Sequence, residues 1–178
     1  MKNNRYEAIL AGVLIAHGII LRLWGYLSDR SLWADEVAIA LNVRLRSFSA
    51  LFRHLDFEQT MPVPLLEIVK SNVMLFGASE YAFRLPLFIV GCVTLIAIWF
   101  VFRHFFGVRV ALISVAMAAI SRPLIYYSSE LKQYGLDALI TVVTLWFGLE
   151  TLRRSDIRSW QALTAWESMT ALAGKRAS

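Results

Sequence analysis

Apolar residues gather in four long runs along this chain, and polar residues separate the runs. The first run covers residues 8–27, and three more follow at 86–102, 108–126 and 133–152. A helix needs about 20 mainly apolar residues to cross a bilayer, so the pattern predicts about four transmembrane helices. We expect the first to be a retained anchor, because it is long for the apolar core of a signal peptide. Near its far end, Arg22 is expected to extend toward the membrane interface.

A long polar segment, residues 28–85, separates the first two runs. Over 37–55, apolar residues recur at helical spacing with arginines between them. This pattern is typical of an amphipathic helix that lies on a membrane surface. Pro62 and Pro64 then interrupt it, because proline lacks a backbone donor and restricts the residue before it. A second surface or partly embedded helix is expected over 65–76.

The pattern changes after residue 154. Residues 155–178 mix helix-forming residues with charges and contain no full span. We therefore expect a transmembrane part over 1–154 and a polar cytoplasmic tail over 155–178. The predicted fold class is an all-α membrane protein with amphipathic surface helices in a long first extracytoplasmic loop.

Composition and charge agree with a membrane protein. The chain is 58% hydrophobic and only 17% charged, against roughly 25% charged residues in soluble domains. Its net charge of +5 is spread along the chain, which gives no nucleic-acid footprint. Basic residues are densest in the short segments beside the predicted spans, which favours a cytoplasmic N-terminus. We expect an integral, multi-pass protein of the inner or plasma membrane.

Two adjacent acids stand out in the segment SLWADEVAIAL, residues 31–41. Neighbouring residues in a helix point about 100° apart, so Asp35 and Glu36 are not expected to share a proton. One of them can face a cleft while the other accepts hydrogen bonds from the backbone or from an arginine. The ordinary alternative is that acids favour the positive end of a helix. The residues alone leave both interpretations open.

A second polar segment is SRPLIYYSSELKQYGLDAL, residues 121–139. If one helix runs from Tyr126, a polar stripe follows at steps of three and four. Its members are Tyr127, Glu130, Tyr134, Asp137, Thr141 and Thr144. Such groups at membrane depth usually face a bundle interior, for catalysis or only for contacts between helices. There is no glycine-rich phosphate loop and no paired-cysteine motif, so no cofactor is evident, and the need for a divalent metal stays open.

Three segments in order resemble a known family. They are RLWGYLSDRSLWADEVAIA, PVPLLEIVKSNVMLFGASEYAFRLP and SRPLIYYSSELKQYGLDAL. Together they resemble the start of the multi-spanning GT-C glycosyltransferases, of the dolichyl-phosphate-mannose protein mannosyltransferase and aminoarabinose transferase type, including the RgtA/B/C/D-like group. The resemblance covers roughly residues 20–150 and implies a partial GT-C fold, the N-terminal portion of such an enzyme. One departure is Met61-Pro62-Val63-Pro64, where many relatives have a His-Pro-Pro signal.

The resemblance also implies an activity and a set of site residues. The activity is transfer of a sugar from a polyprenyl-phosphate-linked donor to a cell-envelope acceptor, which is a lipid, a polysaccharide or a protein. Asp35 matches the catalytic base, and Glu36 is the second member of the acidic motif. The residues that match donor-phosphate or substrate-binding positions are Arg84, Glu130, Lys132 and Tyr134.

The length of the chain limits what the resemblance implies. Members of the family continue through further spans, so we expect a truncated or split enzyme. Its partners would be the lipid-linked donor, membrane lipid and the missing C-terminal part. A non-catalytic remnant or assembly protein that keeps the family topology is the alternative, and a small transporter ranks third.

Overall fold

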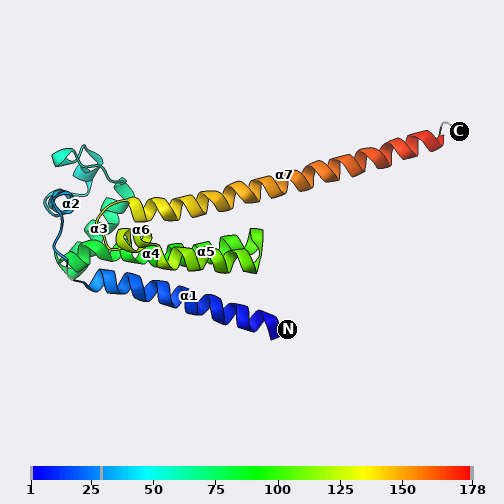
Figure 1. Ribbon diagram of the computed structural model, residues 1–178. Helices are drawn as coiled ribbons and strands as arrows, with labels where there is room; N and C mark the ends of the chain where they lie inside the picture. The colour runs from blue at the N-terminus through cyan, green and yellow to red at the C-terminus, as the bar shows by residue number, and fades with distance from the viewer. Residues whose placement is uncertain (1, 29, 177–178) are drawn as a thin grey trace. The chain divides into compact units, whose positions relative to one another are not determined.

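A computed structural model describes the backbone of residues 2–28 and 30–176, and the side chains of residues 5–28 and 30–155. Within these residues every regular element is a helix (Figure 1). The chain divides into two compact units, residues 1–142 and 143–178, and each is described by itself.

Among the residues that the structure describes, three helices are long and apolar enough to cross a membrane. They are α1 (Lys2–Leu27), α4 (Glu80–Phe106) and the first half of α7 (Tyr134–Arg176). These three stretches overlap three of the four predicted runs, 8–27, 86–102 and 133–152. The prediction of an all-α membrane protein is therefore confirmed.

The fourth predicted span, over 108–126, forms two helices instead of one. Helix α5 (Val108–Ile120) has 13 residues, which rise about 20 Å, short of the roughly 30 Å of a bilayer core. The chain turns at Ser121, whose backbone is extended, and α6 (Arg122–Tyr127) follows. Pro123 lies in the first turn of α6, where its missing N–H is tolerated, whereas inside a longer helix it would break a hydrogen bond.

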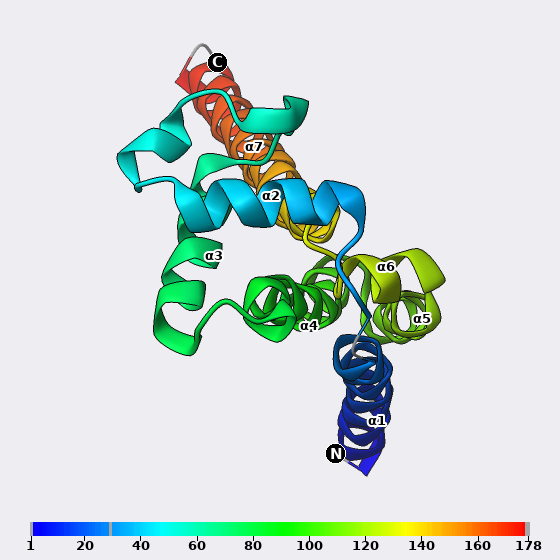
Figure 2. The same ribbon diagram turned by 90° about the vertical axis from the view of Figure 1, so that its left-hand side faces the viewer.

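Helices α1, α4 and α5 pack together in the first unit (Figures 1 and 2). Gly18 lies where they come closest: a Cβ there would stand 2.7 Å from a methyl of Leu95 and 2.9 Å from that of Ala119. Small residues let membrane helices approach closely and gain dispersion contacts. Gly107 joins α4 to α5 with a φ of +84°, which glycine adopts without a Cβ clash.

Arg22 lies inside this packing rather than at the membrane interface. Its side chain is 1% exposed. It donates to the carbonyl of Gly18 at 3.0 Å and to that of Ala118 at 3.1 Å. Because α5 ends at Ile120, its last carbonyls have no donor within the helix, and Arg22 supplies one. The expectation that Arg22 extends to the interface is wrong for this reason.

The polar segment after α1 folds into helices at one end of the bundle. α2 (Ala34–Leu45) and the 3₁₀ helix η1 (Ser49–Phe52) replace the single surface helix expected over 37–55, and η2 (Asp56–Glu58) follows. The second expected helix is present as α3 (Val63–Phe76). Figure 2 shows α2 lying across this end, with α3 beside both α2 and α4. Their apolar residues form a buried cluster, which contains Ile39, Val43, Leu51, Leu65, Leu66, Val69, Phe83, Leu87 and Leu131.

Helix α4 begins six residues before the predicted start of its span. Ser79 caps it, since its Oγ accepts from the N–H of Ala82 at 3.1 Å. Pro86 lies inside the helix and has no N–H for the carbonyl of Ala82, four residues earlier. The side-chain amide of Asn72 on α3 donates to that carbonyl instead. The proline therefore creates an acceptor that fastens α3 to α4.

The second unit continues α7 as one helix to Arg176. Within it, Glu150 accepts hydrogen bonds from Arg153 and Arg154 one turn further on. The side chains after residue 155 lie outside the described residues, so the polar cytoplasmic tail over 155–178 stays a prediction.

Candidate functional site

Glu36 stands at the third position of α2, and its side chain is 0% exposed. Oε2 accepts from the backbone N–H of Trp33, just before the helix, at 3.0 Å. This is the reciprocal half of a capping box, and it satisfies a donor that the helix start leaves unpaired. Oε1 accepts from the backbone N–H of Leu131 at 2.7 Å. One carboxylate thus joins the start of α2 to the turn before α7.

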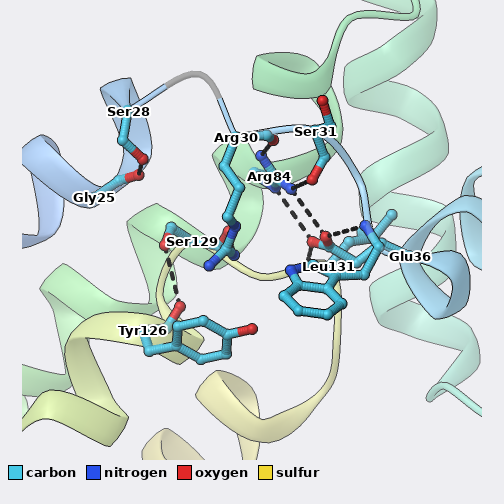
Figure 3. A network of polar contacts seen from close by, with 10 residues as sticks. Gly25, Ser28, Arg30, Ser31, Glu36, Arg84, Tyr126, Ser129 and Leu131 are labelled. Atoms are coloured by element: carbon cyan, nitrogen blue, oxygen red, sulfur yellow. Dashed lines mark hydrogen bonds and ion pairs between the residues drawn. The ribbon is translucent and has the colours of Figure 1, made fainter.

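Arg84, near the start of α4, completes this network (Figure 3). Its Nε donates to Oε1 of Glu36 at 3.2 Å and its Nη2 to Oε2 at 2.8 Å, a bidentate ion pair. The guanidinium is 4% exposed and also donates to the carbonyls of Arg30 and Ser31. The pair therefore holds together α2, α4 and the segment that connects α1 to α2.

The charge state of Glu36 follows from these contacts. Burial alone would raise the pKa of its carboxyl, but the hydrogen bonds from Arg84, Leu131 and Trp33 outweigh burial and lower it. Each carboxylate oxygen accepts two hydrogen bonds, so the usual acceptor positions are occupied. Glu36 has no free position at which to take a proton from a substrate, and its geometry suits a positioning role.

Asp35 has the opposite environment. Its side chain is 67% exposed, and Oδ2 lies 3.3 Å from Nζ of Lys132. Lys132 is itself mostly buried and donates to Oε1 of Gln59 at 2.8 Å. Adjacent positions on a helix point in different directions, which is why one acid faces outward while its neighbour is enclosed. The outward acid keeps acceptor positions free for a substrate.

Glu130 lies in a turn and not on a helical stripe. α6 ends at Tyr127 and α7 begins at Tyr134, so the stripe predicted from Tyr126 onward is interrupted. Burial raises the pKa of the Glu130 carboxyl, and the charge of Glu36 adds to this, while Arg30, Lys132 and a hydrogen bond from Tyr126 oppose it. Among the described residues, no partner reaches its buried Oε2.

Of the six predicted site residues, Tyr134 is the one that lies outside the contacts described above. Its ring packs against Tyr127, with centroids 4.9 Å apart. The remaining five gather around two adjacent acids and the turn before α7: Asp35, Glu36, Arg84, Glu130 and Lys132.

Sequence reasoning missed two residues of the site, Gln59 and Arg30. Gln59 follows two non-glycine residues with positive φ, Phe57 at 62° and Glu58 at 53°. Such backbone costs on the order of 1–3 kcal/mol per residue and is often found at functional sites. Neither missed residue belongs to a motif or a periodic pattern. Only the folded chain brings them to Lys132 and Arg84.

Metal ligands do not gather anywhere among the side chains that the structure describes: no three of histidine, cysteine, aspartate and glutamate form a set. The groups suited to hold a charged part of a substrate are the cations, Lys132 beside Asp35 and Arg30 beside Tyr126.

Residues 63–173 match a family model described as dolichyl-phosphate-mannose-protein mannosyltransferase. The match covers more than half of the chain and includes Arg84, Glu130, Lys132 and Tyr134, and it begins after Asp35 and Glu36. No curated protein and no solved structure matches the chain.

Proposed function

The chain belongs to the dolichyl-phosphate-mannose-protein mannosyltransferase family. From this premise we propose that it transfers a sugar from a lipid-linked donor to a cell-envelope acceptor. The family implies a membrane glycosyltransferase with a polyprenyl-phosphate sugar donor. The three apolar helices of spanning length found in the described part of the chain agree with an integral membrane protein. The acceptor, a lipid, a polysaccharide or a protein, belongs to the proposal.

Asp35 is the proposed general base. The observation that supports it is the contrast within the acidic pair: Glu36 is enclosed by four donors, and Asp35 is exposed beside a cation. A carboxylate with free acceptor positions can take the proton of an acceptor hydroxyl or amine while that atom attacks the anomeric carbon of the sugar. Glu36 and Arg84 would fix the start of α2 and thereby the direction of Asp35.

Lys132 is the proposed cation for the donor phosphate. As the bond between sugar and phosphate breaks, negative charge grows on the departing lipid phosphate, and a fixed ammonium offsets it. Gln59 holds this ammonium at 2.8 Å, so it is oriented before a substrate arrives. Glu130 and Tyr134 would bind substrate from the same turn and from the start of α7.

The proposed orientation puts the site on the extracytoplasmic side of the membrane. Arg84 stands near the start of α4, whereas Arg103 and Arg109 stand at the other end of that helix and just after it. Basic residues in short loops favour the cytoplasmic side. The hairpin between α4 and α5 and the N-terminus would then be cytoplasmic, in the inner or plasma membrane.

The test is turnover of a lipid-linked sugar by membranes that contain the chain. Asp35→Asn keeps the shape of the side chain and removes the base, so we expect transfer to fall about 10²–10⁴-fold. Asp137→Asn, at an exposed aspartate on α7, is the matched control and should leave transfer unchanged. Equal turnover by the Asp35 variant and the native chain would refute the base assignment. An absence of turnover by the native chain with any lipid-linked sugar would favour the non-catalytic alternative.

A further inference from the structure

The segment between α2 and α3 reaches Lys132 through Gln59, and a side chain of α2 holds that segment three residues earlier. The side-chain amide of Asn42 donates to the carbonyl of Asp56 at 3.2 Å. Its Oδ1 accepts from the backbone N–H of Asp56 at 2.9 Å. The side chain of Asn42 therefore pairs with both backbone groups of one residue, as the backbone of a neighbouring strand does in a sheet.

Asn42 is enclosed by the protein. Its side chain is 2% exposed, and its Nδ2 also donates to the carbonyl of Ala38, one turn earlier in α2, at 2.8 Å. Arg46, just after α2, forms an ion pair with the carboxylate of Asp56 at 2.8 Å and donates to the carbonyl of His54 at 2.7 Å. A buried amide is costly unless its donors and acceptor are paired. Asn42 meets this need by fixing Asp56 on α2.

Backbone strain follows directly after this attachment. Phe57 and Glu58 have φ values of 62° and 53°. Bulky residues rarely adopt a positive φ, and such backbone persists only where the surrounding structure holds it. The ring of Phe57 is 64% exposed, so its own packing contributes little to holding it. The restraint comes from the attachments on either side, Asp56 before the strain and Gln59 after it.

Gln59 uses both ends of its side chain. Its Nε2 donates to the carbonyl of Phe57 at 3.2 Å, and its Oε1 accepts from Nζ of Lys132 at 2.8 Å. Lys132 is 12% exposed, and its ammonium has two partners among the described residues, Gln59 and the outward-facing carboxylate of Asp35. The place of one of these partners depends on a strained turn, and so does the orientation of the ammonium.

We propose that Asn42 is a positioning residue that acts on Lys132 through the turn over 56–59. While Asn42 holds Asp56, the two residues with positive φ keep their conformation, and Gln59 stays within hydrogen-bond reach of the ammonium. Without this attachment the turn relaxes and Gln59 withdraws. The consequence for sugar transfer rests on the proposed function, in which Lys132 offsets charge on the departing phosphate. The effect on the position of Lys132 does not depend on it.

Acetylation of the purified full chain with acetic anhydride, followed by peptide mass spectrometry, tests the positioning without any turnover. Asn42→Leu keeps roughly the size of the side chain and removes both bonds to Asp56. Each lost hydrogen bond changes a local equilibrium by about 2–10-fold, so Lys132 should be acetylated about fivefold faster or more. Lys70 is the internal control, because its Nζ donates to the carbonyl of Val43, next to Asn42, and it should react as in the native chain.

A rescue separates positioning from a general structural role. Asparagine adopts a positive φ more readily than phenylalanine, so Phe57→Asn lowers the strain that Asn42 has to hold. Added to Asn42→Leu, it should return the acetylation of Lys132 toward the native rate. If Asn42 only supports the fold, the double variant will stay as reactive as Asn42→Leu. Arg53→Gln, at an exposed arginine on the same segment, is the matched control and should react as the native chain does.

Turnover of a lipid-linked sugar separates this proposal from the proposed function. In an active chain, Asn42→Leu should lower kcat more than it raises KM, because Lys132 acts as the bond to the phosphate breaks. An inactive native chain would count against the proposed function, and acetylation would still test the positioning.

A second variant keeps the test decisive if Asn42→Leu does not fold. In Asn42→Ser the hydroxyl can donate to a carbonyl of its own helix, but it is too short to pair with Asp56, so Lys132 should again react faster. Unchanged acetylation of Lys132 in the variant that folds, or an equal increase for Lys70, would overturn the proposal.

Discussion

Asp35 and Glu36 are neighbours in the chain, yet they lie in opposite environments. Glu36 and Arg84 form a buried ion pair whose donors and acceptors are nearly all used within the protein. Asp35 and Lys132 form a pair in which the acid is 67% exposed. The difference teaches that an acidic motif can divide its work: one carboxylate organises the backbone, and the other stays accessible to a substrate.

The largest difference between the two ion pairs is expected when each acid is removed in turn. Glu36→Ala leaves the charge of Arg84 buried without its partner, which should cost about 3–5 kcal/mol of folding free energy. Asp35→Ala removes only an exposed pair and should cost less than about 1 kcal/mol. Chemical unfolding of both variants in one detergent measures the difference. Equal losses would mean that the two acids share one structural role.

The next largest effect is expected on acidification, which should weaken the buried ion pair of Glu36 and Arg84. The pKa of Glu36 is lowered by Arg84 and two backbone N–H groups. Its contribution to stability is present above the ordinary pKa of 4.5 and is lost as the pH falls below that value toward the lowered one. The unfolding midpoint should therefore fall on acidification in the native chain, and less steeply in Glu36→Gln. Parallel pH profiles for the two proteins would contradict this reading.

A third comparison sets Glu36 against Glu130, because their pKa values move in opposite directions. Burial raises the pKa of Glu130, so the fold disfavours its charged form, and stability is lost as the pH rises through the raised pKa. Glu130→Gln removes this cost and should raise the midpoint of thermal unfolding slightly at neutral pH. Glu36→Gln, measured alongside, should lower it. A lower midpoint for Glu130→Gln would show that its charge supports the fold.

The smallest effect is expected for the exposed pair itself. A double-mutant cycle with Asp35→Asn and Lys132→Met should give a coupling energy of about 0.2–1 kcal/mol. Salt screens charges that face water, so the coupling should decrease further at high ionic strength. The same cycle on Glu36 and Arg84 is the control and should be much less sensitive to salt. A large, salt-insensitive coupling for Asp35 and Lys132 would erase the contrast between the pairs.

The sequence predicted the features that depend on local pattern. Apolar runs of spanning length gave three of the long helices, and helical geometry alone separated Asp35 from Glu36. The break at Ser121 was missed because the apolar run continues through it, and Pro123 is compatible with the start of a helix as well as with its interruption. The error extends to Glu130, which lies in the turn between α6 and α7 and not on the helical stripe predicted from Tyr126.

Contacts between distant segments were beyond the reach of pattern. The backbone N–H that Leu131 donates to Glu36 lies 95 residues away in the sequence. The side chain of Arg84, which also donates to Glu36, lies 48 residues away. No residue spacing along the chain predicts that a particular backbone N–H will donate to a particular carboxylate. The resemblance did place Glu36 and Arg84 in one site, but their mutual ion pair appeared only in the fold.

The bond between Arg22 and Ala118 also constrains the order of biosynthesis. The two residues are 96 positions apart, so Arg22 leaves the ribosome long before this second acceptor exists. At about 5–20 residues per second, the interval is on the order of 5 to 20 seconds. During that time Arg22 has an acceptor in its own helix, the carbonyl of Gly18, and lacks the one from α5. We therefore expect the complete burial of Arg22 to follow the synthesis of α5.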